Sequence, residues 1–314
     1  MRAVAVPAFR AAPSLMEVPE PRLGANELGV RIEAAGMNPF DWKIADGALE
    51  GARPHVFPLV MGIDAAGIVE RVGRDVRRYQ VGDRVFGQFL HDPVGIGTYA
   101  PKTVVPESNG ISRVPSSLNP AQAAAMPTSG MTALSALDQL GLSRGATVLI
   151  VGASGGVGSF AVQLAAAAEL RPIVVARASS HARLRTLGAA EAIDATAEAL
   201  EPRIRALCPS GVDGLLDLMS AGPVFRQMAS LVRPGGVAAT TVHAADPARA
   251  PAAQVRAVNI DLVPSTELLE RLARRFEERH LVIPVERRIR LEDAPAAVAE
   301  GRAGRLGGKT VIEL

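Results

Sequence analysis

The segment that most constrains the fold is a strand followed directly by a glycine-rich turn and a helix. It reads ATVLIVGASGGVGSFAVQLAAAA over residues 146–168. Glycines allow a tight turn, bring backbone amides close to a pyrophosphate and let the helix pack on its strand. The unpaired N–H groups at a helix N-terminus bind anions. We therefore predict a dinucleotide-binding turn, with contacts from Gly152, Ser154, Gly155, Gly156, Val157 and Gly158.

Two other interpretations of this turn stay open. A tight turn without a ligand needs fewer glycines than the four found here. Residues 152–156 also spell GxSxG, the nucleophile elbow of serine hydrolases. A hydrolase would need an acid and a histidine later in the chain, and Asp217 and His243 stand in a usable order. Gly158, in the third-glycine position, and the β-rich segment that precedes the turn favour the dinucleotide interpretation.

Apolar runs recur along the middle of the chain every 20 to 25 residues or so, the spacing of a strand plus a crossover helix. Continuous apolar runs fit strands that are covered on both faces. We predict a doubly wound parallel α/β sheet of the Rossmann type from strands at 147–151, 173–176, 192–193, 214–218, 237–242 and 258–263.

The first 119 residues have a different texture. Gly, Pro and Asp turns separate short apolar runs such as 67–72 and 83–86, which predicts an antiparallel β domain. Helices are expected at 121–125 and 132–140, where the alternating pattern begins. After residue 263 come a helix from Ser265, the segment 291–299 and a closing strand at 309–313.

Composition excludes several classes of protein. The 34 Lys and Arg against 32 Asp and Glu give a net charge of +2, so no strong field attracts nucleic acid. The longest apolar helical run, 160–168, is interrupted by Gln163 and is too short to span a membrane. A single cysteine, Cys208, rules out a four-cysteine zinc site and favours a reducing compartment, the cytoplasm.

The residues after the second predicted strand favour NADPH over NADH. NAD sites usually place an acid about 20 residues beyond the glycines to bind the ribose hydroxyls. Here Arg177 stands 19 residues after Gly158, followed by Ser179, Ser180, Arg183 and Arg185. Such a cluster can hold a 2′-phosphate by charge-assisted hydrogen bonds. Arg183 and Arg185 are equally well explained as ordinary surface charges of a helix.

Taken together, the chain resembles the zinc-independent, zeta-crystallin-like quinone oxidoreductases of the medium-chain dehydrogenase/reductase superfamily. The resemblance runs nearly end to end, through AAGMNPFDWKIADG at 34–47, FPLVMGIDAAGIVERVG at 57–73, VGDRVFG at 81–87, GTYAP at 97–101, AAAMPTSGMTALSAL at 123–137, the glycine turn and LGGKTVIEL at 306–314. It implies a GroES-like catalytic domain at 1–119 and 264–314, a Rossmann NADP-binding domain at 120–263, and an active site in the cleft between them.

The resemblance also bears on zinc. Asn38 stands where the alcohol dehydrogenase branch has a cysteine ligand, and Gly62-Ile63-Asp64 stands where that branch has a histidine ligand. The five histidines, His55, His91, His181, His243 and His280, lack ligand spacing, so each is expected to be a surface or a hydrogen-bonded core residue. We predict no metal.

The implied activity is hydride transfer from NADPH to a small quinone or α,β-unsaturated carbonyl, since activated acceptors need no Lewis acid. An enoyl-thioester or natural-product tailoring reductase uses the same chemistry and is the alternative. A cofactor-binding protein without turnover is a third possibility. The family also implies a homodimer, with the apolar edge segment 258–263 as its expected strand.

The candidate catalytic residues are Asn38, Asp41 and Lys43 in NPFDWK. Asn38 resembles the family asparagine beside the nicotinamide, and Asp41 resembles an acid lining the same cleft. Lys43 replaces the proton-relay histidine or the tyrosine of relatives, and so is a candidate proton donor. The competing interpretation is a solvated Lys43–Asp41 ion pair. Trp42 is expected to be core packing.

Further cofactor contacts follow from the resemblance. Thr132 matches a family threonine near the nicotinamide, Thr240 follows the Pro234-Gly235-Gly236 turn, and Lys309 matches a basic family residue. Several relatives have a tyrosine after the third strand, where this chain reads Ile193-Asp194-Ala195. Arg177 is therefore expected to carry more of the 2′-phosphate recognition.

Overall fold

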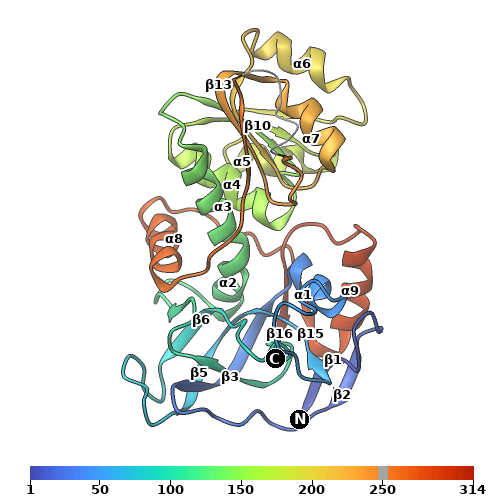
Figure 1. Cartoon of the computed structure of the whole chain (residues 1–314). Helices are drawn as coiled ribbons and strands as arrows, with labels where there is room; N and C mark the ends of the chain where they lie inside the picture. Colours follow the sequence, from blue (N-terminus) through green and yellow to red (C-terminus); the bar gives the residue numbers. More distant parts are fainter. Residues whose placement is uncertain (247–253) are drawn as a thin grey trace. The chain divides into compact units, whose positions relative to one another are not determined.

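The computed structural model describes residues 1–246 and 254–314, which form two compact units (Figure 1). Unit 1 consists of Met1–Ser129, Pro264–Glu278 and Ile283–Leu314, and unit 2 of Gly130–Val263 and Arg279–Val282. The C-terminal segment returns to the unit that the N-terminal segment builds, because strand β16 (Thr310–Glu313) pairs antiparallel with β3 (Glu27–Gly36).

Unit 1 is built on two sheets. Its seven-stranded sheet has the order β15-β16-β3-β5-β6-β8, and β7 also pairs with β3. The pairing is antiparallel except between β15 and β16. The remaining strands of this sheet are β5 (Asp64–Val72), β6 (Arg84–Gln88), β7 (Lys102–Pro106), β8 (Ile111–Arg113) and β15 (Arg287–Arg290).

The smaller sheet of unit 1 pairs β1 (Arg2–Val6) with β2 (Ser14–Glu17) and β4 (Leu59–Val60). Side chains of both sheets and of the helices close one continuous apolar core, which includes Tyr99 and Phe89. The helices of this unit are α1 (Pro39–Ala45), α2 (Pro120–Ala125), α8 (Thr266–Glu278) and α9 (Ala294–Arg302), with a 3-10 turn at Leu291–Asp293. Trp42 on α1 packs against this core, as expected.

Unit 2 contains a six-stranded parallel sheet in the order β11-β10-β9-β12-β13-β14. This is the Rossmann order, in which the chain starts at the centre and winds outward in both directions. The predicted fold class is confirmed. The strands are β9 (Thr147–Val151), β10 (Arg171–Val175), β11 (Glu191–Ile193), β12 (Val212–Asp217), β13 (Val232–Thr240) and β14 (Arg256–Asn259).

Helices alternate with these strands along the chain. They are α3 (Pro127–Leu140), α4 (Gly156–Ala167), α5 (His181–Thr186), α6 (Leu200–Leu207) and α7 (Gly222–Ala229), with a 3-10 turn η1 at Ala178–Ser180. Helix α4 contacts β9 and β10. In the part of the chain that the structure describes, every helix is too short or too polar to cross a membrane.

The structure differs from the sequence-based expectation at the first domain boundary. The expected boundary lay at residue 119, whereas unit 1 continues to Ser129. Helix α2 packs on β3, β5 and β16, which are all strands of unit 1. Gly36 permits this close approach, because a Cβ there would lie 2.1 Å from the Ala124 carbonyl oxygen.

The last two strands of unit 2 also differ from the ranges expected from the sequence. Pro234-Gly235-Gly236 was expected as a turn before a strand at 237–242, but β13 already begins at Val232 and carries these residues as an irregularity in its pairing with β12. The predicted dimer strand at 258–263 is a strand only as far as Asn259, where β14 ends. Strand β14 does lie at the edge of the sheet.

Candidate active site

The glycine turn follows β9 in unit 2, as the sequence predicts, and each glycine has its own geometry. Gly152 has a φ of +81°, which favours glycine. A Cβ on Gly158 would lie 2.5 Å from the Cα of Ala153, so this glycine lets α4 pack against the turn. A Cβ on Gly155 would meet only the Gly152 carbonyl oxygen, at 3.5 Å, which leaves open space beside the backbone.

The N-terminus of α4 is suited to an anion. Gly155 is its N-cap residue and supplies no side chain to cap the first N–H groups. Helix α4 has 12 residues, enough for its aligned dipoles and free amides to attract negative charge. The pyrophosphate of a dinucleotide fits here, because there is open space beside Gly155 and the amides of Gly156, Val157 and Gly158 are uncapped.

Arg177 and Ser179 follow β10, the strand beside β9, and both side chains are exposed. Arg177 makes no ion pair within the described residues, so its guanidinium is available to a ligand. Arg183 is placed differently. Its Nη1 donates to the Ser159 hydroxyl and its Nη2 to the Ser154 carbonyl oxygen, both at 3.0 Å. Arg183 therefore holds the glycine turn to α5.

The other predicted contacts of unit 2 are buried. Thr132 lies on α3 and Thr240 ends β13, where its hydroxyl accepts from the Val242 amide at 3.2 Å. The residues of the serine-hydrolase alternative do not come together. His243 is exposed and pairs with Asp261, while Asp217 is buried and accepts from the amides of Met219 and Ser220.

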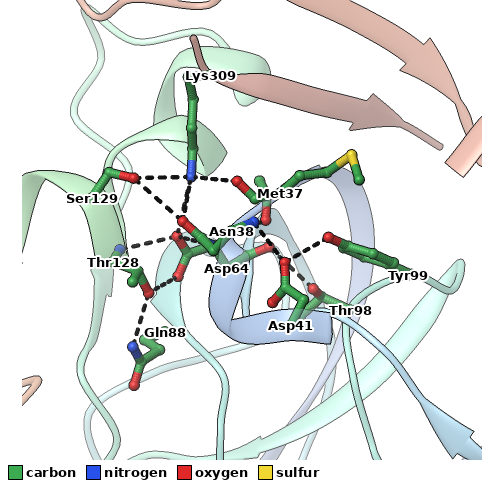
Figure 2. A network of polar contacts seen from close by, with 11 residues as sticks. Met37, Asn38, Asp41, Asp64, Gln88, Thr98, Tyr99, Thr128, Ser129 and Lys309 are labelled. Atoms are coloured by element: carbon green, nitrogen blue, oxygen red, sulfur yellow. Dashed lines mark hydrogen bonds and ion pairs between the residues drawn. The ribbon is translucent and has the colours of Figure 1, made fainter. Parts of the chain in front are cut away.

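Unit 1 contains a buried polar network around Lys309 (Figure 2). The Lys309 side chain is 1% exposed, and its Nζ donates to Asn38 Oδ1 at 2.7 Å, the Met37 carbonyl oxygen at 3.0 Å and Ser129 Oγ at 3.3 Å. The same Nζ lies 3.7 Å from Asp64 Oδ2. Sequence reasoning expected Lys309 as a cofactor contact, whereas the structure makes it the central cation of an internal cluster.

Asp64 receives hydrogen bonds from several elements. The Asn38 amide donates to Oδ2 at 2.9 Å, and Thr128 donates to the carboxylate through both its backbone N–H, at 2.9 Å, and its hydroxyl, at 2.7 Å. Gln88 donates in turn to the Thr128 hydroxyl at 2.8 Å. Sequence reasoning missed Asp64, Thr128 and Gln88 as network members, although Asp64 and Thr128 lie within the recognised motifs.

Helix α1 begins inside the same network. Asn38 is its N-cap, Pro39 opens the first turn, and Asp41 Oδ2 accepts from the Asn38 backbone N–H at 2.6 Å. Oδ2 also accepts from the Tyr99 hydroxyl at 2.6 Å. Asp41 is thus 1% exposed and fixed from two sides. Because the Lys43 side chain on the same helix is exposed and Asp41 is buried, the solvated Lys43–Asp41 ion pair does not form.

Burial dominates the electrostatics of this cluster. It raises the pKa of Asp41 to about 7, although the hydrogen bonds from Tyr99 and Asn38 act in the opposite direction. Burial also raises the pKa of Asp64, against the neighbouring Lys309 ammonium, and lowers the pKa of Lys309. One buried cation is shared by two buried carboxyls. Of the two carboxyls, Asp41 has a pKa of about 7, close to neutral pH.

A small cavity of about 20 Å³ adjoins Asp41 and His91. His91 is buried, and its Nδ1 lies 2.8 Å from the Phe89 carbonyl oxygen. Asp41 Oδ1 and His91 Nε2 are both buried without a hydrogen-bond partner. Such a volume holds one water molecule. His91 is therefore a core histidine with one nitrogen unsatisfied by protein groups, in contrast to the expectation that it would be satisfied.

The two positions at which the resembled zinc enzymes have ligands are Asn38 and Ile63. Asn38 uses its amide oxygen to accept from Lys309 and its amide nitrogen to donate to Asp64. Ile63 is 3% exposed and belongs to the apolar core. Within residues 1–246 and 254–314, no group of three His, Cys, Asp or Glu side chains is arranged to hold a metal.

Comparisons with known proteins match two regions of this chain. Residues 24–116 match the family described as "Alcohol dehydrogenase GroES-like domain", and residues 187–312 match "Zinc-binding dehydrogenase". A chloroplastic quinone oxidoreductase from Triphysaria versicolor is 30% identical over 312 residues, covering 95% of this chain and 93% of the relative.

Two other plant relatives match over a shorter stretch. A chloroplast envelope quinone oxidoreductase homolog from Arabidopsis thaliana is 36% identical over 57% of this chain. A 2-methylene-furan-3-one reductase from Solanum lycopersicum is 33% identical over 72% of this chain. The matches span only 55% and 58% of these relatives.

Solved structures of related proteins are similar to this chain over its full length. The quinone oxidoreductase of Coxiella burnetii has a TM-score of 0.86 and 27% identity, covering 100% of this chain and 99% of that one. A mycobacterial protein solved in complex with NADPH has a TM-score of 0.87 and 25% identity over the full length of both chains. The fold and the sequence matches thus define a two-unit member of the medium-chain dehydrogenase/reductase superfamily. Within it, this chain belongs to the quinone oxidoreductase family.

The buried carboxyl of Asp41 predicts a specific pH dependence of stability. Its folded-state pKa of about 7 exceeds the ordinary value of 3.8, so the stability it contributes is complete below pH 3.8 and is lost as the pH rises to about 7. Relative to wild type, Asp41→Asn should gain up to about 1.4 kcal/mol per pH unit across this window. Urea unfolding followed by the fluorescence of the single tryptophan, Trp42, measures the difference. If the free energies of unfolding of wild type and Asp41→Asn changed equally with pH, the raised pKa of Asp41 would be contradicted.

The Lys309–Asp64 pair predicts non-additive mutations. Lys309→Met should cost about 3–5 kcal/mol, because it leaves the Asp64 carboxylate buried without its cation. Adding Asp64→Asn should recover part of this loss. The control is Arg288→Met, which breaks a half-exposed pair with Glu313 on the same sheet and should cost less than about 1 kcal/mol. Additive losses in the double variant would exclude the pairing, with Trp42 fluorescence again as the signal.

Proposed function

We propose that the protein is an NADPH-dependent, zinc-independent oxidoreductase that transfers a hydride to small quinones or α,β-unsaturated carbonyls. The observation that carries the proposal is the Lys309 ammonium hydrogen-bonded to Asn38, the residue at a zinc-ligand position of related enzymes. Asn38 also binds Asp64, so both polar groups of its amide are committed to internal partners. Ile63 at the second ligand position offers no donor atom.

The residues of unit 2 would hold the nucleotide. The α4 N-terminus and the space beside Gly155 fit its pyrophosphate, and the exposed Arg177 with Ser179 suits a 2′-phosphate. The NADPH complex of the mycobacterial neighbour supports this choice. When bound, the nicotinamide supplies the hydride. The chain itself must orient the acceptor, exclude water and provide a proton.

The acceptor class follows from the proposed absence of a Lewis acid. A carbonyl without metal polarisation is a poor hydride acceptor, whereas a quinone or an enone is already electron-poor. After hydride addition, negative charge develops on oxygen and needs a hydrogen-bond donor or a proton. The relatives named quinone oxidoreductase and 2-methylene-furan-3-one reductase support this acceptor class.

Lys43 is the proposed donor for that oxygen. It lies on α1, whose start is fixed by the Asn38 cap and by Asp41, and its ammonium is exposed. Asn38 and Asp41 are proposed to act as positioning residues, since their polar groups point into unit 1. A homodimer through the β14 edge and a reducing, cytoplasmic setting complete the proposal. Sedimentation as a monomer at micromolar concentrations would remove the dimer.

The proposed activity is tested on metal-free protein. Calorimetry with NADPH and NADH should show binding with a preference for NADPH. Absorbance at about 340 nm should then fall when a simple quinone or enone is added. An enoyl-thioester acceptor in the same panel tests the alternative substrate class. Binding without oxidation of any acceptor would identify a cofactor-binding protein, and absence of binding would overturn the proposal.

Lys43→Met tests the proton donor in the same assay. The turnover number for enone reduction should fall by about 10²-fold or more, while the NADPH dissociation constant stays near the wild-type value. Lys102→Met serves as a control, because this half-buried lysine of unit 1 lies on β7 and pairs with Glu20 and Glu70. Unchanged turnover in Lys43→Met would remove Lys43 from the mechanism.

A further inference from the structure

Three strands of unit 2 end side by side at the edge that would receive the nucleotide. Val151 at the end of β9 pairs with Val175 of β10, and Val175 pairs with Ile193 of β11. The glycine turn, Arg177 and Asp194 therefore follow three neighbouring strands in that order. Adjacent strands lie about 4.8 Å apart, so Asp194 is one strand beyond Arg177 and two beyond the glycine turn.

The Asp194 carboxylate turns back toward the loop that carries Arg177. Its Oδ2 accepts from the Ala178 backbone N–H at 2.7 Å, and Ala178 is the residue directly after Arg177. Its Oδ1 accepts from the backbone N–H of Thr196 at 2.9 Å and from the Thr196 hydroxyl at 2.6 Å. The first backbone N–H of η1 is thus already hydrogen-bonded to the Asp194 carboxylate.

This carboxylate is negatively charged at any physiological pH. The hydrogen bonds from Thr196 and Ala178 lower the pKa of Asp194 to about 2, with a smaller contribution from the neighbouring His181. Asp194 therefore holds a fixed negative charge against the backbone of the loop after β10, the same loop that carries the exposed cation Arg177. A phosphate bound near Arg177 would be attracted by Arg177 and repelled by Asp194, whereas an uncharged ribose hydroxyl carries no charge for Asp194 to repel.

We propose that Asp194 is a specificity-determining residue that opposes the 2′-phosphate of NADPH and so limits the preference for NADPH over NADH. The inference rests on the proposed function, because it takes the 2′-phosphate to bind beside Arg177. Arg177 attracts the phosphate and Asp194 repels it. The ratio of the two nucleotide affinities then reports the balance between these side chains, rather than Arg177 alone.

The test is Asp194→Asn, with dissociation constants for NADPH and NADH measured by calorimetry. An asparagine oxygen can still accept from Ala178 or Thr196, so the loop keeps an acceptor while the charge is lost. The NADPH dissociation constant should fall about three- to tenfold at low salt, and that for NADH should stay unchanged. The gain should shrink between about 0.02 M and about 0.3 M salt, because the repulsion is screened.

Glu169→Gln is the matched control. It removes one negative charge from the same unit, at the end of α4 opposite the glycine turn, where Glu169 pairs with Arg144. This variant should leave the affinity ratio unchanged. Arg177→Met should weaken the binding of NADPH but not that of NADH. Such a result would show that the 2′-phosphate binds beside Arg177.

The outcomes separate the two proposals. If wild type binds neither nucleotide, the proposed function fails and the inference falls with it. If wild type binds NADPH but Asp194→Asn leaves the affinity ratio unchanged, only the role of Asp194 is overturned. An equal change for both nucleotides would also overturn it, because Asp194 would then act by ordering the loop. A salt-sensitive gain for NADPH alone supports the proposal.

Discussion

The buried ammonium of Lys309 is the interaction on which unit 1 most depends. It joins the last strand of the chain to Asn38 at the start of α1, to Asp64 at the start of β5 and to Ser129 on α3. A charge removed from water is costly unless it is paired and hydrogen-bonded, and here three acceptors and a carboxylate satisfy it. Segments from both ends of the sequence are thereby tied to one point beneath α1.

The same cluster explains why α1 presents its residues as it does. The helix is only seven residues long, too short to be stable by itself, and its start is fixed by Asp41 and Tyr99. The exposed Lys43 therefore projects from a rigid support. The buried Lys309 ammonium donates to Asn38 and lies beside Asp64, and this packing underlies the proposal that the chain works without zinc.

Unit 2 is proposed to recognise a large anion, the dinucleotide, with few charged side chains. Parallel strands bring successive loops to one edge, and backbone amides at α4 supply donors that no side chain has capped. A few charged side chains along that edge add to these backbone donors. Arg183 is used to hold the turn, Arg177 is left exposed, and Asp194 adds a negative charge one strand further on.

The sequence by itself determined the doubly wound parallel sheet, the glycine turn and the family, because apolar periodicity and glycine spacing are local signals. It also located Asn38, Asp41 and Lys309 within motifs. Only the tertiary structure decided their roles, since burial and partners depend on segments far apart in the chain: Lys309 meets Asn38 across 271 residues, and Asp41 meets Tyr99 across 58. The place of α2 and the hydrogen bonds of Arg183 and Asp194 were likewise set by packing and strand register, which no local pattern of residues encodes.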